Sequence, residues 1–255
     1  MKDKFSIVEV DTSGTSKDGP RRTAEKVCDV VLDWIEQELS EEILHVPKDE
    51  IVNLFGKHLV IKSSDAEKLL SIFAVRGSFL PREQVERDGS KVQALPVVIV
   101  RNKSGDVLCM RRRERNAENP LHEKLVLWAG GHVRREDGEN GTAILHGALR
   151  ELNEELRLNV EPQEVRLLGA IYMDVGGRSS KHVAIVYEWR APSDEVEIAL
   201  CSTEFSERRG NSLSGRFFPL NELPKELTTD SAEVWSSEII RQLLPEATSG
   251  QPVLY

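Results

Sequence analysis

The sequence predicts a protein of the α/β (α+β) class on two observations. Short apolar segments bounded by turn residues, which are typical of strands, lie at 95–100, 107–110, 125–128, 166–174 and 182–189. Segments with apolar residues at three- and four-residue intervals, which are typical of helices, lie before, between and after them. Charged residues make up 30% of the chain, as expected for a globular protein.

The chain is predicted to carry a small lobe in front of its main domain. Residues 1–22 are expected to form a flexible tail, because 11–22 are polar and interrupted by glycine and proline. Residues 23–90 are expected to form a mixed α+β lobe. The main domain is expected at 91–245, with a C-terminal tail at 246–255.

The elements of the lobe follow from local signals. In order, we expect an amphipathic helix over 27–35, a short helix between Pro47 and Gly56, a strand at 58–61 and a helix through Phe73. Ser64 and Glu67 have the spacing of a capping box, which would open the last of these helices.

In the main domain, the sequence Asn-Lys-Ser-Gly-Asp at 102–106 predicts a hairpin between the first two strands. The strand at 125–128 leads directly into Gly130 and Gly131. A last helix is predicted over 231–244, with Asp230 and Glu233 placed to cap it.

The most informative helix is predicted around residue 150. Its apolar residues form one stripe, made of Ala148, Leu149, Leu152 and Leu156. Glu151, Glu154 and Glu155 are expected to share the other face, where like charges repel each other. Three carboxylates placed so closely require a cation, and Mg²⁺ prefers such oxygen ligands.

The residues Arg150-Glu151-Leu152-Asn153-Glu154-Glu155, a loop after Gly130-Gly131-His132, resemble the second half of the Nudix box. That pattern is G-x5-E-x7-R-E-U-x-E-E-x-G-U, in which U is aliphatic. With Lys181-His182-Val183 and Glu233-Val234-Trp235-Ser236, the chain from about Leu44 onwards looks like the bacterial Nudix branch of MutT-like phosphoesterases. The resemblance implies an α/β/α sandwich with a mixed β-sheet.

The chain departs from the Nudix pattern at two places. The loop between Gly131 and Arg150 is longer than the box allows, so the position of the first glutamate of the box is open. We expect Glu139 there, because a glycine precedes it and Thr142 can cap the helix beyond; Glu136 is the alternative. The glycine after the helix is replaced by Arg157, which puts the local turn in doubt.

The resemblance implies a role for each residue of the box. Glu151, Glu154, Glu155 and the carbonyl of Gly131 would bind Mg²⁺, with Mn²⁺ as an alternative. Arg150 would hold the helix and loop in register by pairing with Glu139, because a guanidinium grips a carboxylate at two points. The general base is left open between Glu151 and a carboxylate of a late loop, Glu204 or Glu207.

Four further residues are candidates for substrate binding. Arg111 and Arg113 belong to a basic cluster at a strand end that could grip phosphates, although charge runs usually face water. His132 and His182 could donate hydrogen bonds to substrate, although a lone histidine more often has a structural role.

The composition limits the partners. A net charge of −9 and a pI near 5.3 argue against binding nucleic acid through its phosphates. The three cysteines lack the spacing of a redox pair or zinc site, and no apolar run has the length of a membrane span. We expect a cytoplasmic protein that binds a nucleotide-like or other phosphorylated small molecule; a homodimer is left open.

The resulting functional prediction is hydrolysis of a phosphoanhydride bond in a nucleoside diphosphate-linked or related small molecule, by a metal-activated water. One alternative is a Nudix-fold module that senses a nucleotide without turnover. The other is that the acidic helix is a surface for binding proteins.

Overall fold

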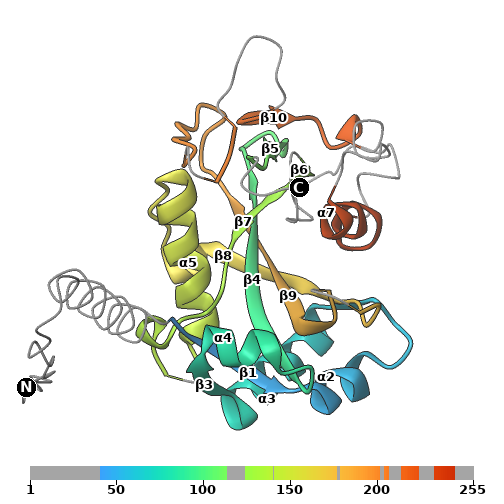
Figure 1. Ribbon diagram of the computed structural model, residues 1–255. Coiled ribbons are helices and arrows are strands. Elements are labelled where there is room, and N and C mark those ends of the chain that lie inside the picture. Colours follow the sequence, from blue (N-terminus) through green and yellow to red (C-terminus); the bar gives the residue numbers. More distant parts are fainter. Residues whose placement is uncertain are drawn as a thin grey trace, which may run out of the picture.

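The computed structural model describes residues 41–113, 124–139, 141–176, 179–201, 204–206, 214–223 and 233–244 (Figure 1). The predicted tails at 1–22 and 246–255 and the predicted helix at 27–35 lie outside the described residues.

A mixed sheet of ten strands forms the centre of the described part. The strands are β1 (Glu42–Pro47), β2 (Val60–Lys62), β3 (Ser78–Pro81), β4 (Lys91–Arg101), β5 (Val107–Arg111), β6 (Leu125–Val126), β7 (Trp128–Gly130), β8 (Val165–Tyr172), β9 (His182–Arg190) and β10 (Arg216–Phe218). The longest path through the sheet is β10-β5-β4-β9-β8-β2, and β1 and β7 also pair with β4. Strands β4 and β9 run parallel, whereas the other pairs of described strands are antiparallel, so the sheet is mixed as predicted.

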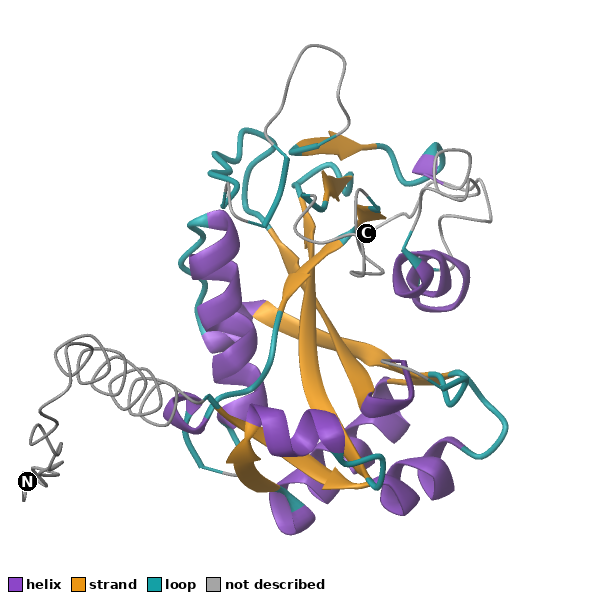
Figure 2. Ribbon diagram, in the orientation of Figure 1, coloured by secondary structure: helices purple, strands orange, loops and turns teal. Residues whose placement is uncertain are grey.

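Helices lie on both sides of this sheet. The α-helices are α2 (Lys48–Phe55), α3 (Ser63–Arg76), α4 (Arg82–Arg87), α5 (Ala143–Leu156) and α7 (Val234–Glu238). A π-helix, η4 (Ile239–Leu243), continues α7, and short 3-10 turns lie at η1 (Arg135–Asp137), η2 (Pro162–Glu164) and η3 (Ser179–Lys181). Figures 1 and 2 show α5 and α7 on opposite sides of the sheet, which confirms the predicted sandwich, with α2, α3 and α4 grouped at its lower end.

Strand β4 explains why the core is apolar on both faces of the sheet. Its residues Val97 to Val100 are all buried, because β4 has partners along both edges and α5 packs against it. The sequence of a strand that is covered on both faces is a continuous apolar run, and polar and apolar residues do not alternate in it. The apolar run at 95–100 predicted this element for that reason.

Several predicted elements are confirmed. The hairpin forms where Arg101 pairs with Val107. Helix α2 starts after Pro47 and ends at Gly56, which has a φ of +56°. The strand at 125–128 is present, but it is divided at Leu127 into β6 and β7. None of the described helices combines the length and the apolar character that a membrane crossing requires.

Other predictions need correction. Helix α3 starts at Ser63, and no side chain caps it, so the capping box at Ser64 is wrong. The helix predicted from 231 begins at Val234 in the described residues; the carboxylate of Glu233 caps it as predicted, whereas Asp230 lies outside the described residues. Strands β1, β3 and β10 and helix α4 were not predicted, because each is short and is defined mainly by its partners.

Candidate functional site

Helix α5 carries the predicted acidic residues and packs against β4 and β7. Ala148, Leu152 and Leu156 of the predicted apolar stripe are buried, whereas Leu149 is half-buried. Glu154 is exposed, but Glu151 and Glu155 are only 7% and 5% exposed. The prediction that all three share the face opposite the stripe is therefore wrong for these two. They lie four residues apart at the edge of the stripe, so both point toward the end of β7.

The two glycines at the end of β7 allow this close approach. A Cβ atom on Gly130 would clash with the backbone of Pro96 and Val97 in β4. A Cβ atom on Gly131 would clash with the carboxylate of Glu151. The sheet thus requires a glycine at 130, whereas Gly131 leaves room for the Glu151 carboxylate at the position that it occupies.

The loop partner of Arg150 is Asp137. Arg150 Nε donates to Asp137 Oδ1 at 2.7 Å, and Arg150 Nη2 donates to Oδ2 at 3.0 Å. The backbone N–H of Arg134 donates to the same Oδ2 at 2.8 Å, which closes the turn η1. The side chain of Asp137 is 4% exposed, so this is a buried, two-point ion pair.

The predicted pairing of Arg150 with Glu139 is therefore wrong, as is the alternative Glu136. Both of these side chains are exposed, because η1 turns only Asp137 inward. Thr142 occupies the N-cap position of α5, but its side chain makes no capping hydrogen bond. Asp137 stands six residues after Gly131, which is the G-x5-E spacing of the box; counting from the glycine and accepting aspartate would have found it.

Arg150 also joins two carboxylates of α5. Its Nη1 donates to Glu151 at 2.7 Å and to Glu154 at 3.0 Å, and its Nη2 donates to the carbonyl of His132 at 2.8 Å. Burial raises the pKa of Glu151, and the guanidinium of Arg150 opposes that shift. One arginine thus fixes the loop, the helix and two acidic side chains relative to one another.

Glu155 has a different set of partners. Its Oε1 accepts a hydrogen bond from Arg112 Nη1 at 2.8 Å, and its Oε2 accepts one from the backbone N–H of Gly130 at 2.9 Å. Burial raises the pKa of Glu155 to about 7, although Arg112 acts in the opposite direction. Arg112 Nη1 also lies 3.2 Å from Glu204, so this predicted candidate for the general base comes to the site. Glu207 lies outside the described residues.

The end of α5 keeps the turn that its missing glycine had put in doubt. Arg157 adopts the left-handed conformation, with φ of 59° and ψ of 29°. Its N–H donates to the carbonyl of Asn153 at 3.0 Å, which is the hydrogen bond of an αL helix end. The departure from the family pattern changes the residue at this position and leaves the turn intact.

The predicted substrate-binding histidines lie together. The Nε2 atoms of His132 and His182 are 3.4 Å apart, and the two rings are tilted with centroids at 5.4 Å. Burial, followed by the positive charge of Arg82, lowers the pKa of His132 well below its usual value. Both rings therefore belong to one cluster beside Gly131.

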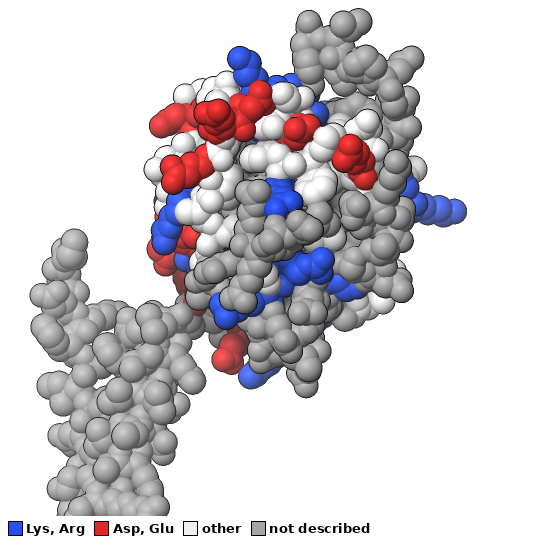
Figure 3. Space-filling model, turned by 90° about the horizontal axis from the view of Figure 1, so that it is seen from above, with Lys and Arg blue, Asp and Glu red and all other residues white. Residues whose placement is uncertain are grey.

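Arg111 is the last residue of β5, and Arg113 follows two residues later. The side chain of Arg111 is half-buried and that of Arg113 is exposed, whereas Arg112 between them is buried. Figure 3 looks onto the end of the molecule that carries β5 and β10, where Lys and Arg side chains cross the middle of the described surface. Positive charge is thus present at this end, although the chain as a whole is acidic.

The acidic residues fit a divalent cation in chemistry but do not all converge. Within the described ranges, no three His, Cys, Asp or Glu side chains lie close enough together to hold a metal ion. Glu155 is bound to Arg112 and Gly130, whereas Glu151 and Glu154 share Arg150 Nη1. Carboxylate oxygens are the donors that Mg²⁺ prefers, so Glu151 and Glu154 are the pair that fits it.

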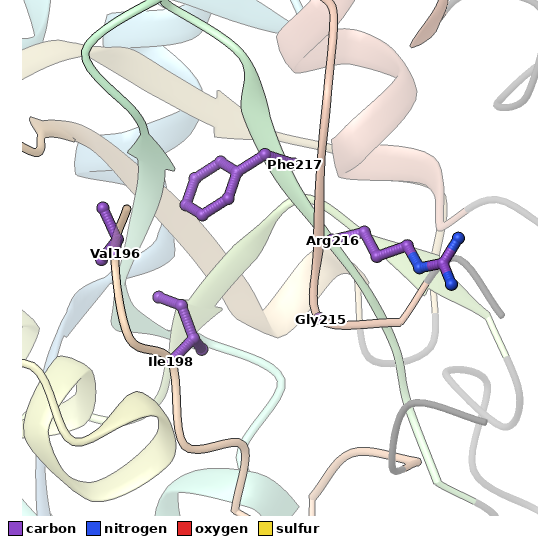
Figure 4. Close-up of a pocket in the computed structure, with 5 residues that line it drawn as sticks. All are labelled: Val196, Ile198, Gly215, Arg216 and Phe217. Carbon is purple, nitrogen blue, oxygen red and sulfur yellow. The ribbon is translucent and has the colours of Figure 1, made fainter. Parts of the chain in front are cut away.

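A separate cavity of about 300 Å³ lies between the chain at 196–198 and β10. Figure 4 shows the ring of Phe217 directed toward Val196 and Ile198, while the side chain of Arg216 points away from them. Gly215 completes the lining. The cavity includes none of the predicted site residues.

Comparison with known proteins agrees with the fold and with the motif. The NUDIX domain model matches residues 91–241, which is more than half of the chain. Protein YmaB of Bacillus subtilis (strain 168) is 24% identical over 209 residues, covering 79% of this chain and 97% of YmaB. The crystal structure of Tm1382, a candidate Nudix hydrolase, is similar with a TM-score of 0.61 and 25% identity, over 81% of this chain and 100% of Tm1382. DR0079 from Deinococcus radiodurans has a TM-score of 0.44 and 19% identity, over 59% of this chain and 82% of its own. With its NUDIX domain, its mixed sheet and the arginine-linked acidic helix, this chain belongs to the Nudix superfamily.

Proposed function

We propose that this protein hydrolyses a phosphoanhydride bond in a nucleoside diphosphate derivative or a related phosphorylated small molecule, with the help of a divalent cation. The NUDIX domain match supports a hydrolase. The observation that carries the proposal is the position of Glu151: its carboxylate lies against Gly131, where no side chain intervenes, and shares Arg150 Nη1 with Glu154.

Glu151 and Glu154 would hold the cation, Mg²⁺ or alternatively Mn²⁺. When bound, such an ion screens the charge of a pyrophosphate and activates a water for attack on phosphorus. Arg150 would keep Glu151 in place, because Asp137 and the carbonyl of His132 hold its guanidinium from the loop side. The chain's own contribution is therefore to fix the acidic helix and the glycine loop in one arrangement.

Two carboxylates of the described residues could take the proton from water. Glu151 lies on α5, and Glu204 approaches from the later loop, where Arg112 holds it. For the substrate, His132 and His182 would lie on one side of the acidic residues, and Arg111 and Arg113 would contact phosphates. These substrate contacts are part of the proposal.

The test is a screen of nucleoside diphosphate derivatives for Mg²⁺-dependent release of phosphate or nucleotide. Glu154→Gln should lower the rate by orders of magnitude and barely alter thermal stability without metal, because its side chain is exposed. Glu67→Gln is the matched control, since Glu67 is an exposed glutamate on α3, away from the acidic helix.

Two results would count against the proposal. A fully active Glu154→Gln variant would remove this residue from the mechanism. Tight binding of a nucleotide derivative without turnover, in the presence of Mg²⁺ or Mn²⁺, would favour the alternative of a sensing module.

A further inference from the structure

We propose that Arg112 is a positioning residue that fixes the carboxylates of Glu155 and Glu204 beside the carboxylates proposed to bind the metal. The inference rests on the proposed function. It concerns an arginine that follows β5 and lies outside the Nudix box, between the half-buried Arg111 and the exposed Arg113.

The guanidinium of Arg112 is enclosed. Its side chain is 8% exposed, and Nη1 donates to Glu155 at 2.8 Å and to Glu204 at 3.2 Å. The guanidinium carbon lies 5.0 Å from the ring centre of Trp128 and 4.5 Å from that of Phe205. These distances are those of cation–π contacts, so two aromatic rings and two carboxylates surround one charge.

The surrounding residues are themselves held in place. The backbone N–H of Arg112 donates to the carbonyl of Lys124 at 2.9 Å, and Arg112 forms a β-bridge with Phe205. Trp128 Nε1 donates to Glu233 at 3.1 Å, and the Glu233 carboxylate caps α7. Helix α7, β7 and the loop at 204–206 thus converge on the arginine.

This arrangement determines the orientation of Glu155. Arg112 binds its Oε1, and the N–H of Gly130 binds its Oε2, so both oxygens are fixed. Glu151 lies one helical turn away on the same side of α5 and faces Gly131. Without Arg112, only the bond from Gly130 would orient the Glu155 carboxylate, and the Glu204 carboxylate would lose its contact with the arginine. The loop itself would stay attached to α5, because the N–H of Cys201 donates to the carbonyl of Glu155 at 2.8 Å. Glu155 would act on the cation through its negative charge beside Glu151. Removing a direct partner of a metal ligand changes metal affinity by about 10- to 100-fold, and Arg112 lies one contact further out, so we expect the lower end of that range.

The experiment measures Mg²⁺ affinity by isothermal titration calorimetry, together with kcat and KM, in the full-length protein. Arg112→Met should weaken Mg²⁺ binding by about tenfold and lower kcat more than it raises KM. Arg112→Lys should restore part of both effects. Against a Glu155→Gln background, Arg112→Met should have little further effect, because the arginine acts through that carboxylate.

A simple repulsion argument predicts the opposite result. If Arg112 were only a nearby positive charge, Arg112→Met would strengthen Mg²⁺ binding. That outcome, unchanged Mg²⁺ affinity, or full additivity with Glu155→Gln would overturn the inference.

Two further variants separate positioning from loss of folding. Arg101→Met breaks another buried arginine–glutamate pair, with Glu188 at 3.1 Å, so it should destabilise the protein without changing Mg²⁺ affinity. Phe205→Leu removes one cation–π contact while leaving the charges paired, and it should weaken Mg²⁺ binding to a smaller extent than Arg112→Met.

The same measurements distinguish this inference from the proposed function. A wild-type protein that binds no Mg²⁺ overturns both. Wild-type binding and hydrolysis that Arg112→Met leaves unchanged overturn the inference alone. Wild-type binding without hydrolysis of any tested compound counts against the proposed function, while the affinity comparison still decides the role of Arg112.

Discussion

Replacement of Asp137 by alanine should destabilise the protein strongly, because it removes one partner of a buried ion pair. The carboxylate accepts hydrogen bonds from Arg150 Nε, Arg150 Nη2 and the N–H of Arg134, and its side chain is 4% exposed. Removing one partner of such a pair costs about 3–5 kcal/mol. Arg150 would keep Glu151 and Glu154, so we expect the lower part of that range, about 3 kcal/mol.

The measurement is urea unfolding followed by far-UV circular dichroism, with a common m-value for all variants. Glu136→Ala and Glu139→Ala are matched controls from the same loop, and both should change the unfolding free energy by less than about 0.5 kcal/mol, because these side chains are exposed. Asp137→Asn should be intermediate, since it keeps an acceptor but loses the charge. A loss below about 1 kcal/mol for Asp137→Ala, or a larger loss for Glu139→Ala, would refute the assignment of the loop partner.

Three smaller changes test other parts of the structure. Arg157→Gly should raise the unfolding free energy by about 0.5–1 kcal/mol in urea, because glycine relieves the left-handed conformation, and a destabilised variant would contradict this. Burial, aided by Lys91, lowers the pKa of His45, so the folded protein favours the neutral ring. The contribution of the neutral ring to the free energy of unfolding is complete above the ordinary pKa of 6.5 and is lost as pH falls below it. The stability of wild type relative to His45→Gln should therefore fall between pH 7.5 and 5.5, and an equal difference at both pH values would rule the effect out. Gly131→Ala should abolish hydrolysis by displacing the Glu151 carboxylate, whereas Gly141→Ala, whose Cβ would meet no atom within 4 Å, should stay active; equal activities would disprove the need for a glycine at 131.

Local patterns predicted the parts of the fold that depend on local sequence. The apolar runs of β4, β8 and β9 and the periodicity of α5 are properties of single segments, and each element formed close to its predicted range. Strand β1 is different, because its pairing with β3 and β4 defines it as much as its own residues do. Propensity contains little information about such partners.

The residues of the candidate site that lie on α5 could be predicted from the sequence. Arg150 and the three glutamates lie on α5 as the motif indicated. The sequence did not show that Glu151 and Glu155 would be buried, because that depends on how deeply α5 packs against β7. Arg112 was missed for a related reason: in a run of arginines, only the strand geometry decides which side chain turns inward.

The pairing of β1 with β4 bears on any shortened form of this protein. The NUDIX match begins at residue 91, the first residue of β4, and so excludes β1, whose Val46 and Pro47 pair with Val92 and Lys91. A chain starting there would also lose β2 from the outer edge of β8. Strands β4 and β8 would then each have an edge with unpaired backbone donors and acceptors, which can pair with other chains. The point at which the family resemblance starts is therefore a poor place to cut, and we expect such a fragment to aggregate.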